Sequence, residues 1–182
     1  MRKRLALVLS VAAASGSLVL AAAPADAGQG VTFSLTAGSL VISDPADRAL
    51  GSVSTGTATL SSTLGSVTVT DSRGALNGTW TASVASTDFT TGSASTEETI
   101  GKAQVDYWSG LATANTGTAV LVPGQLLVIN KQALSTSRTA YSATGVIGNN
   151  TATWAPTVVV NVPAQAVAGT YSGTITHSVT GT

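Results

Sequence analysis

Apolar and polar residues alternate with a period of two along much of this chain. The alternation is clearest where Thr or Ser separates apolar side chains, at residues 31–35, 66–70, 79–84 and 170–179. Successive side chains of a strand point to opposite faces of a sheet. The pattern therefore predicts half-buried strands with one apolar face and one face of hydroxyl groups.

Shorter apolar runs predict four more strands, at residues 40–43, 52–60, 126–129 and 157–162. Turn residues separate these runs. Strands that recur at short spacing with turns between them are typical of a sandwich or a barrel. We therefore expect an all-β fold, an antiparallel β-sandwich of Ig-like style.

Two segments, residues 92–115 and 135–153, have no clear period, and we expect them to be long excursions between strands. They contain Tyr107, Trp108 and Tyr141. Aromatic side chains on loops that a rigid scaffold carries are good candidates for ligand contact. The alternative is that these rings fold back as lids over the edge of the sandwich.

Residues 1–27 have the pattern of a signal peptide. Three basic residues come first, an uncharged apolar stretch follows over residues 5–23, and residues 25–27 have the small-x-small pattern of a cleavage site. We predict cleavage after residue 27, which leaves a single domain over residues 28–182. The alternative is an uncleaved membrane anchor, although Ser and Gly weaken the stretch as a span. No later segment is predicted to cross a membrane.

The charge pattern argues against nucleic acid as a partner. Charged residues make up 9% of the chain, and removal of residues 1–27 leaves five basic and seven acidic side chains. Binding to phosphates needs clustered Lys and Arg, whereas these basic residues are scattered singly. With no Cys and one His, the chain lacks thiolate and multi-histidine metal sites. The nearby acids Asp44 and Asp47 form no calcium-loop motif, so we expect no metal and no cofactor.

Two stretches resemble the signatures of the WxL domain family, surface domains of Gram-positive bacteria. The first is Asp71-Ser-Arg73-Gly, which we expect to be a turn, followed by Trp80-Thr-Ala82. The second is a turn at residues 162–164 followed by a last strand with His177-Ser-Val179. Ala82 stands where the family has Leu, and His177 stands where it has Trp. The chain is therefore similar to a divergent relative of the family.

The resemblance implies a β-sandwich, export, and non-covalent attachment to the cell wall through peptidoglycan. We expect a secreted, cell-wall-associated module that binds peptidoglycan or another wall glycan, and no enzyme. No sortase-type Leu-Pro-x-Thr-Gly motif is present. The alternative is a structural or adhesive surface subunit that binds protein partners through exposed strand edges.

The motif positions Trp80, Ala82, His177 and Val179 are the candidate binding residues. Trp80 is expected to be a core anchor between the sheets, or else an exposed platform on which a glycan stacks. His177 is expected to be a partly buried ring with one nitrogen in a hydrogen bond. As a catalytic base it would need a nucleophile and an orienting acid beside it, and no Gly-x-Ser-x-Gly elbow is present. Trp80 and His177 should point into the same interior.

Overall fold

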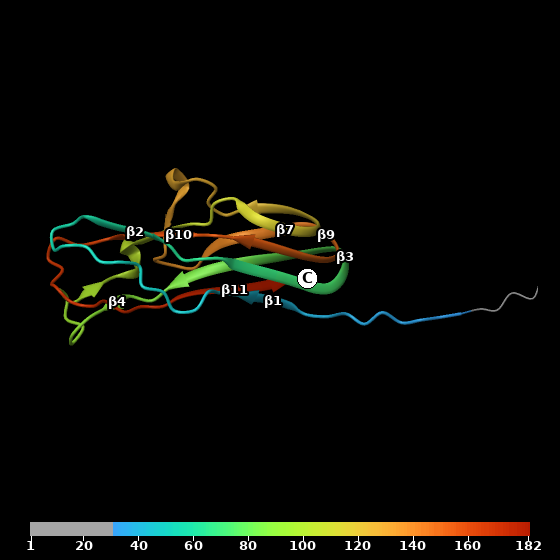
Figure 1. Ribbon diagram of the computed structural model, residues 1–182, viewed down its shortest axis with the longest axis horizontal. Helices are drawn as coiled ribbons and strands as arrows, with labels where there is room; N and C mark the ends of the chain where they lie inside the picture. The colour runs from blue at the N-terminus through green and yellow to red at the C-terminus, as the bar shows by residue number, and fades with distance from the viewer. Residues whose placement is uncertain (1–30) are drawn as a thin grey trace, which may run out of the picture. The chain divides into compact units, whose positions relative to one another are not determined.

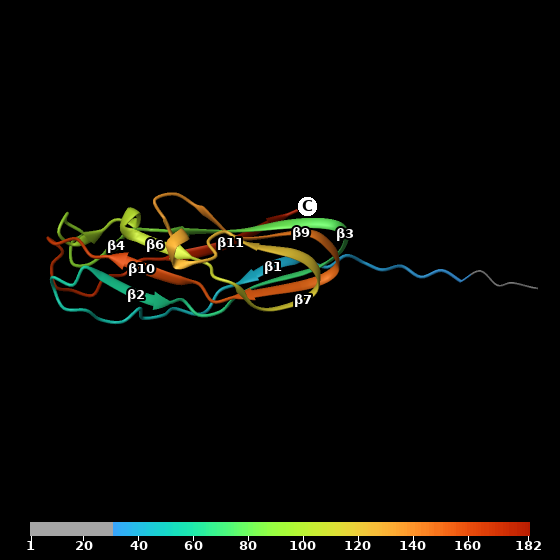
Figure 2. The same ribbon diagram turned by 90° about the horizontal axis from the view of Figure 1, so that it is seen from above.

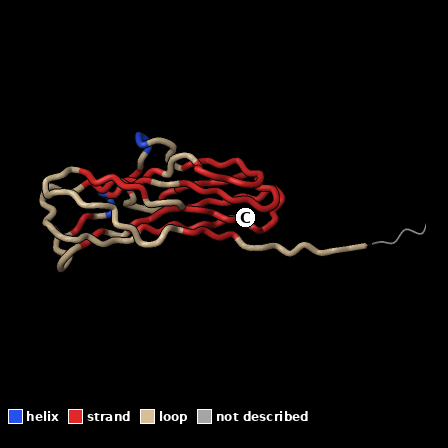
Figure 3. Tube along the Cα trace, in the orientation of Figure 1, coloured by secondary structure: helices blue, strands red, loops and turns tan. Residues whose placement is uncertain are grey.

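Antiparallel strands make up most of the part of the chain that the computed structural model describes, residues 31–182 (Figure 3). The predicted signal peptide lies outside the described residues. Residues 35–182 form one unit, and residues 31–34 belong to another. The strands are β1 (Leu40–Ser43), β2 (Thr59–Thr63), β3 (Val67–Ser86), β4 (Phe89–Thr90), β5 (Thr99–Ile100), β6 (Val105–Trp108), β7 (Ala112–Pro123), β8 (Gln132–Ala133), β9 (Arg138–Trp154), β10 (Thr157–Asn161) and β11 (Ile175–Gly181), and the 3-10 helices are η1 (Lys102–Gln104) and η2 (Val128–Asn130).

The strands form three sheets (Figure 1). The first has the order β1-β3-β9-β7, and β11 also pairs with β3. The second has the order β2-β10-β6-β8, and the third contains only β4 and β5. All pairs are antiparallel. The predicted all-β antiparallel sandwich is confirmed, and its Ig-like style stays a prediction.

The long strand β9 doubles back on itself. The rings of Tyr141 and Trp154 both belong to β9, and their centroids are 4.9 Å apart. A straight strand of that length would separate these residues by about 43 Å, at roughly 3.3 Å per residue. Gly145 and Gly148 lie between them with φ of 61° and 68°, a backbone region that glycine enters without steric cost. β9 therefore contributes one half to each layer of the sandwich.

Its partner β3 bends at the matching place. The pairing of β3 with β9 shifts register between Asp71 and Ala75, where Gly74 has a φ of 65°. The predicted turn at residues 71–74 thus lies within the bend of this strand. Because both strands bend together, the first sheet folds over and forms both layers at this end of the domain, as Figure 2 shows for β3, β7 and β9.

The second sheet continues one of these two layers. The backbone N–H of Leu64 donates to the carbonyl of Pro156 at 2.9 Å, which joins the β2–β10 pair to the β3–β9 pair. The opposite layer contains β11 beside the last part of β3. Apolar side chains fill the space between the layers. The buried cluster comprises Val67, Val69, Trp80, Ala82, Val84, Val105, Tyr107, Leu134, Ala140, Tyr141, Ala143, Val146, Ala152, Trp154 and Val158.

Several predicted strands are confirmed and others are wrong. Residues 40–43 and 157–161 form β1 and β10, and both alternating runs between residues 66 and 84 lie in β3. The predicted strand at residues 52–60 is displaced, since β2 begins at Thr59. The predicted buried strand at residues 126–129 is instead an exposed segment that runs into η2. A short apolar run carries no period, so sequence alone does not fix its structure.

The two predicted excursions are also corrected. Residues 92–115 contain β5, β6 and the start of β7, and residues 138–154 form β9. Gly and Asn at the bend of β9 interrupt its alternation of apolar and polar residues. The sequence therefore did not indicate a strand there. The last strand begins at Ile175 and not at residue 170. Neither 3-10 helix of the described residues has the length and apolar character needed to cross a membrane.

Candidate functional site

The stretch from Asp71 to Gly74 stabilises the bend of β3. The guanidinium of Arg73 donates from Nε to Oδ1 of Asp71 at 2.9 Å and from a terminal nitrogen to Oδ2 at 2.8 Å. The same terminal nitrogen lies 3.0 Å from the carbonyl oxygen of Thr79, on the far side of the bend. Hydrogen bonds from Arg73 lower the pKa of the Asp71 carboxyl, although burial opposes the shift. This two-point pair positions the guanidinium, and its bond to the carbonyl of Thr79 joins the two arms of β3.

Trp80 is a core residue. Its side chain is 1% exposed, and its indole Nε1 donates to Oδ1 of Asn150 at 3.3 Å. Ala82 is fully buried, and it pairs with the half-buried Val179 of β11. A buried indole has no face on which a sugar could stack. The core-anchor interpretation of Trp80 is therefore the one that the structure supports.

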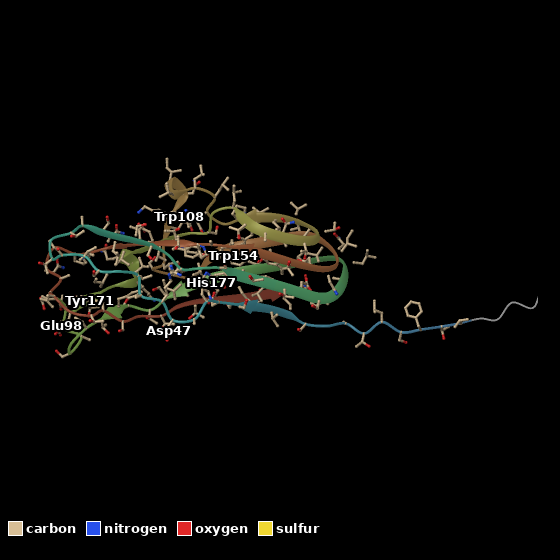
Figure 4. The ribbon with its side chains drawn as sticks, viewed as in Figure 1. Asp47, Glu98, Trp108, Trp154, Tyr171 and His177 are labelled. Atoms are coloured by element: carbon tan, nitrogen blue, oxygen red, sulfur yellow. The ribbon has the colours of Figure 1, made fainter. Side chains whose placement is uncertain are left out.

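His177 lies at the centre of a buried polar array that crosses the sandwich. Its Nε2 is 3.0 Å from the hydroxyl of Tyr107 on β6, and the indole Nε1 of Trp154 donates to that hydroxyl at 3.2 Å. Its Nδ1 is 2.8 Å from Oδ1 of Asp44 without the alignment of a hydrogen bond. Its backbone N–H donates to Oδ2 of the same carboxylate at 3.1 Å. Figure 4 shows Trp154 and His177 beside each other.

One set of proton positions fits every contact of this array. Trp154 donates to the Tyr107 oxygen, the Tyr107 hydroxyl donates to Nε2 of His177, and the proton of the neutral ring sits on Nδ1, facing Asp44. Burial lowers the pKa of His177, although the charge of Asp44 opposes this shift. Burial also raises the pKa of the Tyr107 hydroxyl. Both groups are therefore held in their neutral forms.

A cavity of about 150 Å³ opens beside this array. Asp44 and His177 line it together with Phe89 and with residues 45–48 and 173–175. Asp44 is the acid that orients the histidine, and about a third of its side chain is exposed. Solvent therefore reaches the carboxylate, whereas the hydroxyl of Tyr107 lies on the opposite side of the ring, inside the core.

A larger groove of about 1040 Å³ adjoins this cavity, with which it shares Phe89. Two loops bound it, residues 47–55 and residues 166–174. The ring of Tyr171 is half-buried, and its hydroxyl lies 2.9 Å from the carbonyl oxygen of Val167. Small hydroxyl side chains dominate the remaining polar lining: Ser52, Ser54, Thr55, Thr170, Ser172 and Thr174.

This groove suits an uncharged, hydroxyl-rich ligand. Its charged lining residues are only Asp47 and Arg48, of opposite sign. Ser and Thr hydroxyls both donate and accept hydrogen bonds, so they match sugar hydroxyls. The rings of Phe89 and Tyr171 and several aliphatic side chains supply apolar surface among these polar groups, the usual composition of a small-molecule site. Figure 4 shows Tyr171 and Asp47 at this end of the domain.

No protein-family model, no curated protein and no solved structure matches this chain.

The three aromatic candidates from the expected loops lie in strands. Tyr107 is on β6 and Tyr141 on β9, and both are buried, so their placement on loops was wrong. Side chains alternate along β6, which puts Tyr107 in the core and leaves Trp108 half-buried on the other face. The structure brings Tyr107 to His177 and places Trp108 and Tyr171 in different parts of the domain, as Figure 4 shows for this last pair.

Sequence reasoning missed the groove and the partner of His177. Many residues of the groove loops are Ser, Thr and Gly, types that occur throughout the chain and therefore give no signal of their own. Asp44 was noted only beside Asp47, yet its partner His177 lies 133 positions further along the chain.

Proposed function

We propose that this chain is a secreted cell-surface module that binds a cell-wall glycan non-covalently through the groove between residues 47–55 and 166–174. The observation that carries the proposal is the chemistry of this groove, which combines hydroxyl groups, two aromatic rings, several aliphatic side chains and little charge. The resemblance of stretches in β3 and β11 to WxL signatures, together with the pattern of a signal peptide, supports a wall polymer as the ligand.

The buried motif positions have a supporting role in this proposal. Trp80 and His177 belong to the core and shape the sandwich that carries the groove loops. His177 comes closest to the ligand site, since the smaller cavity that it lines shares Phe89 with the groove. The site residues that we propose for contact with the glycan are therefore Tyr171 and the hydroxyl side chains of the two loops.

A hydrolase is a weaker proposal for the same site. The hydroxyl beside Nε2 of His177 belongs to Tyr107, and burial raises its pKa, which makes the phenolate more costly to form. That hydroxyl also lies in the core, away from the cavity that Asp44 lines. A nucleophile has to reach the substrate, so this geometry favours binding without turnover.

Sedimentation with purified cell walls tests the proposal. The purified exported protein is mixed with isolated Gram-positive walls, and the bound fraction in the pellet is measured. The same assay is repeated with walls stripped of teichoic acids and other accessory polymers. Binding to both preparations identifies peptidoglycan as the ligand, and binding only to unstripped walls identifies an accessory polymer. Failure to sediment with either preparation contradicts the proposal.

A further inference from the structure

Four consecutive aliphatic residues lie exposed where the chain runs from β7 into η2. Leu126, Leu127, Val128 and Ile129 are 43%, 57%, 55% and 83% exposed, and we call this segment the apolar tip. Elsewhere in residues 35–182 the exposed large apolar residues stand singly in the sequence, which is ordinary for a protein surface. A run of four exposed apolar residues is a defect in a sequence unless it has a function.

The fold fixes both ends of the apolar tip. Before it, Gln125 is buried, and its side-chain Nε2 donates to the carbonyl of Thr139 at 2.9 Å. The carbonyl of Gln125 also accepts a hydrogen bond from the hydroxyl of Ser109 at 3.1 Å. After the tip, β8 pairs with β6, and Leu134 is buried in the core. The exposure of the tip is therefore built into the fold.

The turn at the apolar tip points its side chains in different directions. The backbone N–H of Asn130 donates to the carbonyl of Leu127 at 2.8 Å, which closes η2. A 3-10 helix has three residues per turn, so successive side chains lie about 120° apart around its axis. In Figure 1 the amber coiled ribbon of η2 projects from the strands. A flat protein surface would cover one side of such a turn, whereas a fluid apolar phase would surround it.

The size and charge of the apolar tip also fit a lipid surface better than a protein. Each partner in a stable protein complex contributes roughly 800 Å² of surface, and four partly exposed aliphatic side chains supply well under that area. No charged residue lies between Asp106 and Lys131 in the sequence. These two residues form an ion pair with each other at the base of the tip. Insertion of the tip would therefore carry no charge into hydrocarbon, where a charge is costly.

An aromatic ring lies near the base of the apolar tip. Trp108 shares the outer face of β6 with Asp106, the partner of Lys131, and its side chain is half-buried. An indole has a large apolar body and one polar N–H, and Trp is enriched at the boundary between lipid and water for this reason. The base of the tip thus combines an ion pair with an indole, which suits the headgroup level of a membrane.

We propose that the apolar tip inserts into the surface of a phospholipid bilayer and holds the domain there. Residues 126–129 would enter the boundary between headgroups and acyl chains, to a depth of about 5–10 Å, while the sheets stay in water. Because the attraction is apolar, binding should persist at high salt and should not require anionic lipid. The proposal goes beyond wall binding and does not depend on it.

Co-sedimentation of the purified exported protein with sucrose-loaded vesicles tests the proposal. Vesicles of phosphatidylcholine, with and without phosphatidylglycerol, are titrated at low and high salt. We expect binding to both kinds of vesicle, and Ile129→Asp should weaken it by at least about tenfold. Leu76→Asp is the matched control, because Leu76 is 86% exposed at the bend of β3 and is not part of the tip. No binding, binding only to anionic vesicles at low salt, or an equal loss in the control overturns the proposal.

A fluorophore at the apolar tip locates the contact, since the chain has no cysteine of its own. Ile129→Cys and Leu76→Cys are each labelled with an environment-sensitive nitrobenzoxadiazole group and mixed with the same vesicles. We expect the emission to shift to the blue for the label at position 129 and to stay unchanged at position 76. If the label at position 129 shifts without vesicles as the protein concentration rises, a second copy covers the tip and the proposal is wrong.

Discussion

The hydroxyl of Tyr107 on β6 lies 3.0 Å from Nε2 of His177 on β11, so a hydrogen bond joins the two layers of the sandwich through the core. These residues are 70 positions apart in sequence. Trp154 and Asp44 complete the array on either side. A buried chain of hydrogen bonds in an apolar interior favours one arrangement of the layers, because a slip would separate donors from the acceptors that they now contact.

Removal of the Tyr107 hydroxyl tests this array. Tyr107→Phe keeps the ring but leaves Nε2 of His177 and the indole N–H of Trp154 without their partner. We expect a loss of about 1–3 kcal/mol in the free energy of unfolding, measured by urea denaturation. If the variant's urea denaturation curve had an unchanged midpoint and slope, the array would contribute nothing to stability.

The pKa of His177 makes stability depend on pH in a defined window. Burial lowers this pKa from 6.5 in the folded protein, so the unfolded chain binds the proton first as the pH falls. The contribution of the neutral ring is therefore complete above pH 6.5 and is lost as the pH falls towards the folded-state pKa. Thermal unfolding between about pH 7.5 and pH 5 should show a falling Tm. His177 is the only histidine, so His177→Gln should flatten that slope; an equal slope in the variant contradicts this assignment.

Trp80 and Trp108 should differ strongly in their effect on stability. Truncation of the buried indole in Trp80→Ala should cost about 3–5 kcal/mol of unfolding free energy. Trp108 is half-buried on the other face of its strand, so Trp108→Ala should cost clearly less. Chemical denaturation of both variants provides the comparison. Equal losses would mean that Trp80 does not anchor the core.

The pair of Asp71 and Arg73 should matter more than a surface ion pair. The Asp71 side chain is fully buried, and Arg73→Ala would leave its carboxylate without the two guanidinium contacts. We expect a loss of about 1.5–3 kcal/mol at neutral pH, as for hydrogen bonds to a charged group. Because the pKa of Asp71 is lowered in the folded protein, this stabilisation should disappear as the pH falls through the folded-state pKa, below 3.8. A loss that does not change with pH would assign the effect to packing.

The sequence predicted the sandwich through runs that keep a clean period of two, as at residues 66–70 and 79–84, which lie in the two arms of β3. It did not predict β9, because the residues with positive φ that bend this strand, Gly145 and Gly148, interrupt the alternation. It assigned residues 31–35 to a strand, but the first strand of the described residues is β1, which begins at Leu40. A strand needs a neighbour, and neighbours are set by contacts between distant parts of the chain.

The candidate site was predictable only in part. The pattern placed Trp80 and His177 on the apolar face of their strands, and both are buried. The contact between His177 and Asp44 joins residues that are 133 positions apart in the sequence, and no local pattern indicates it. The groove consists of loop residues whose types occur throughout the chain, so only the fold reveals that they face one another.

Binding of the wall by a matched pair of lysine variants tests the central claim most directly. Thr170→Lys puts a long charged side chain into the groove, and Thr176→Lys puts the same side chain on the exposed face of β11, outside the groove lining. Both positions are exposed, so both variants should fold. We predict that Thr170→Lys abolishes sedimentation with cell walls and that Thr176→Lys sediments like the unmodified protein. Full wall binding by Thr170→Lys would show that the groove is not the binding site.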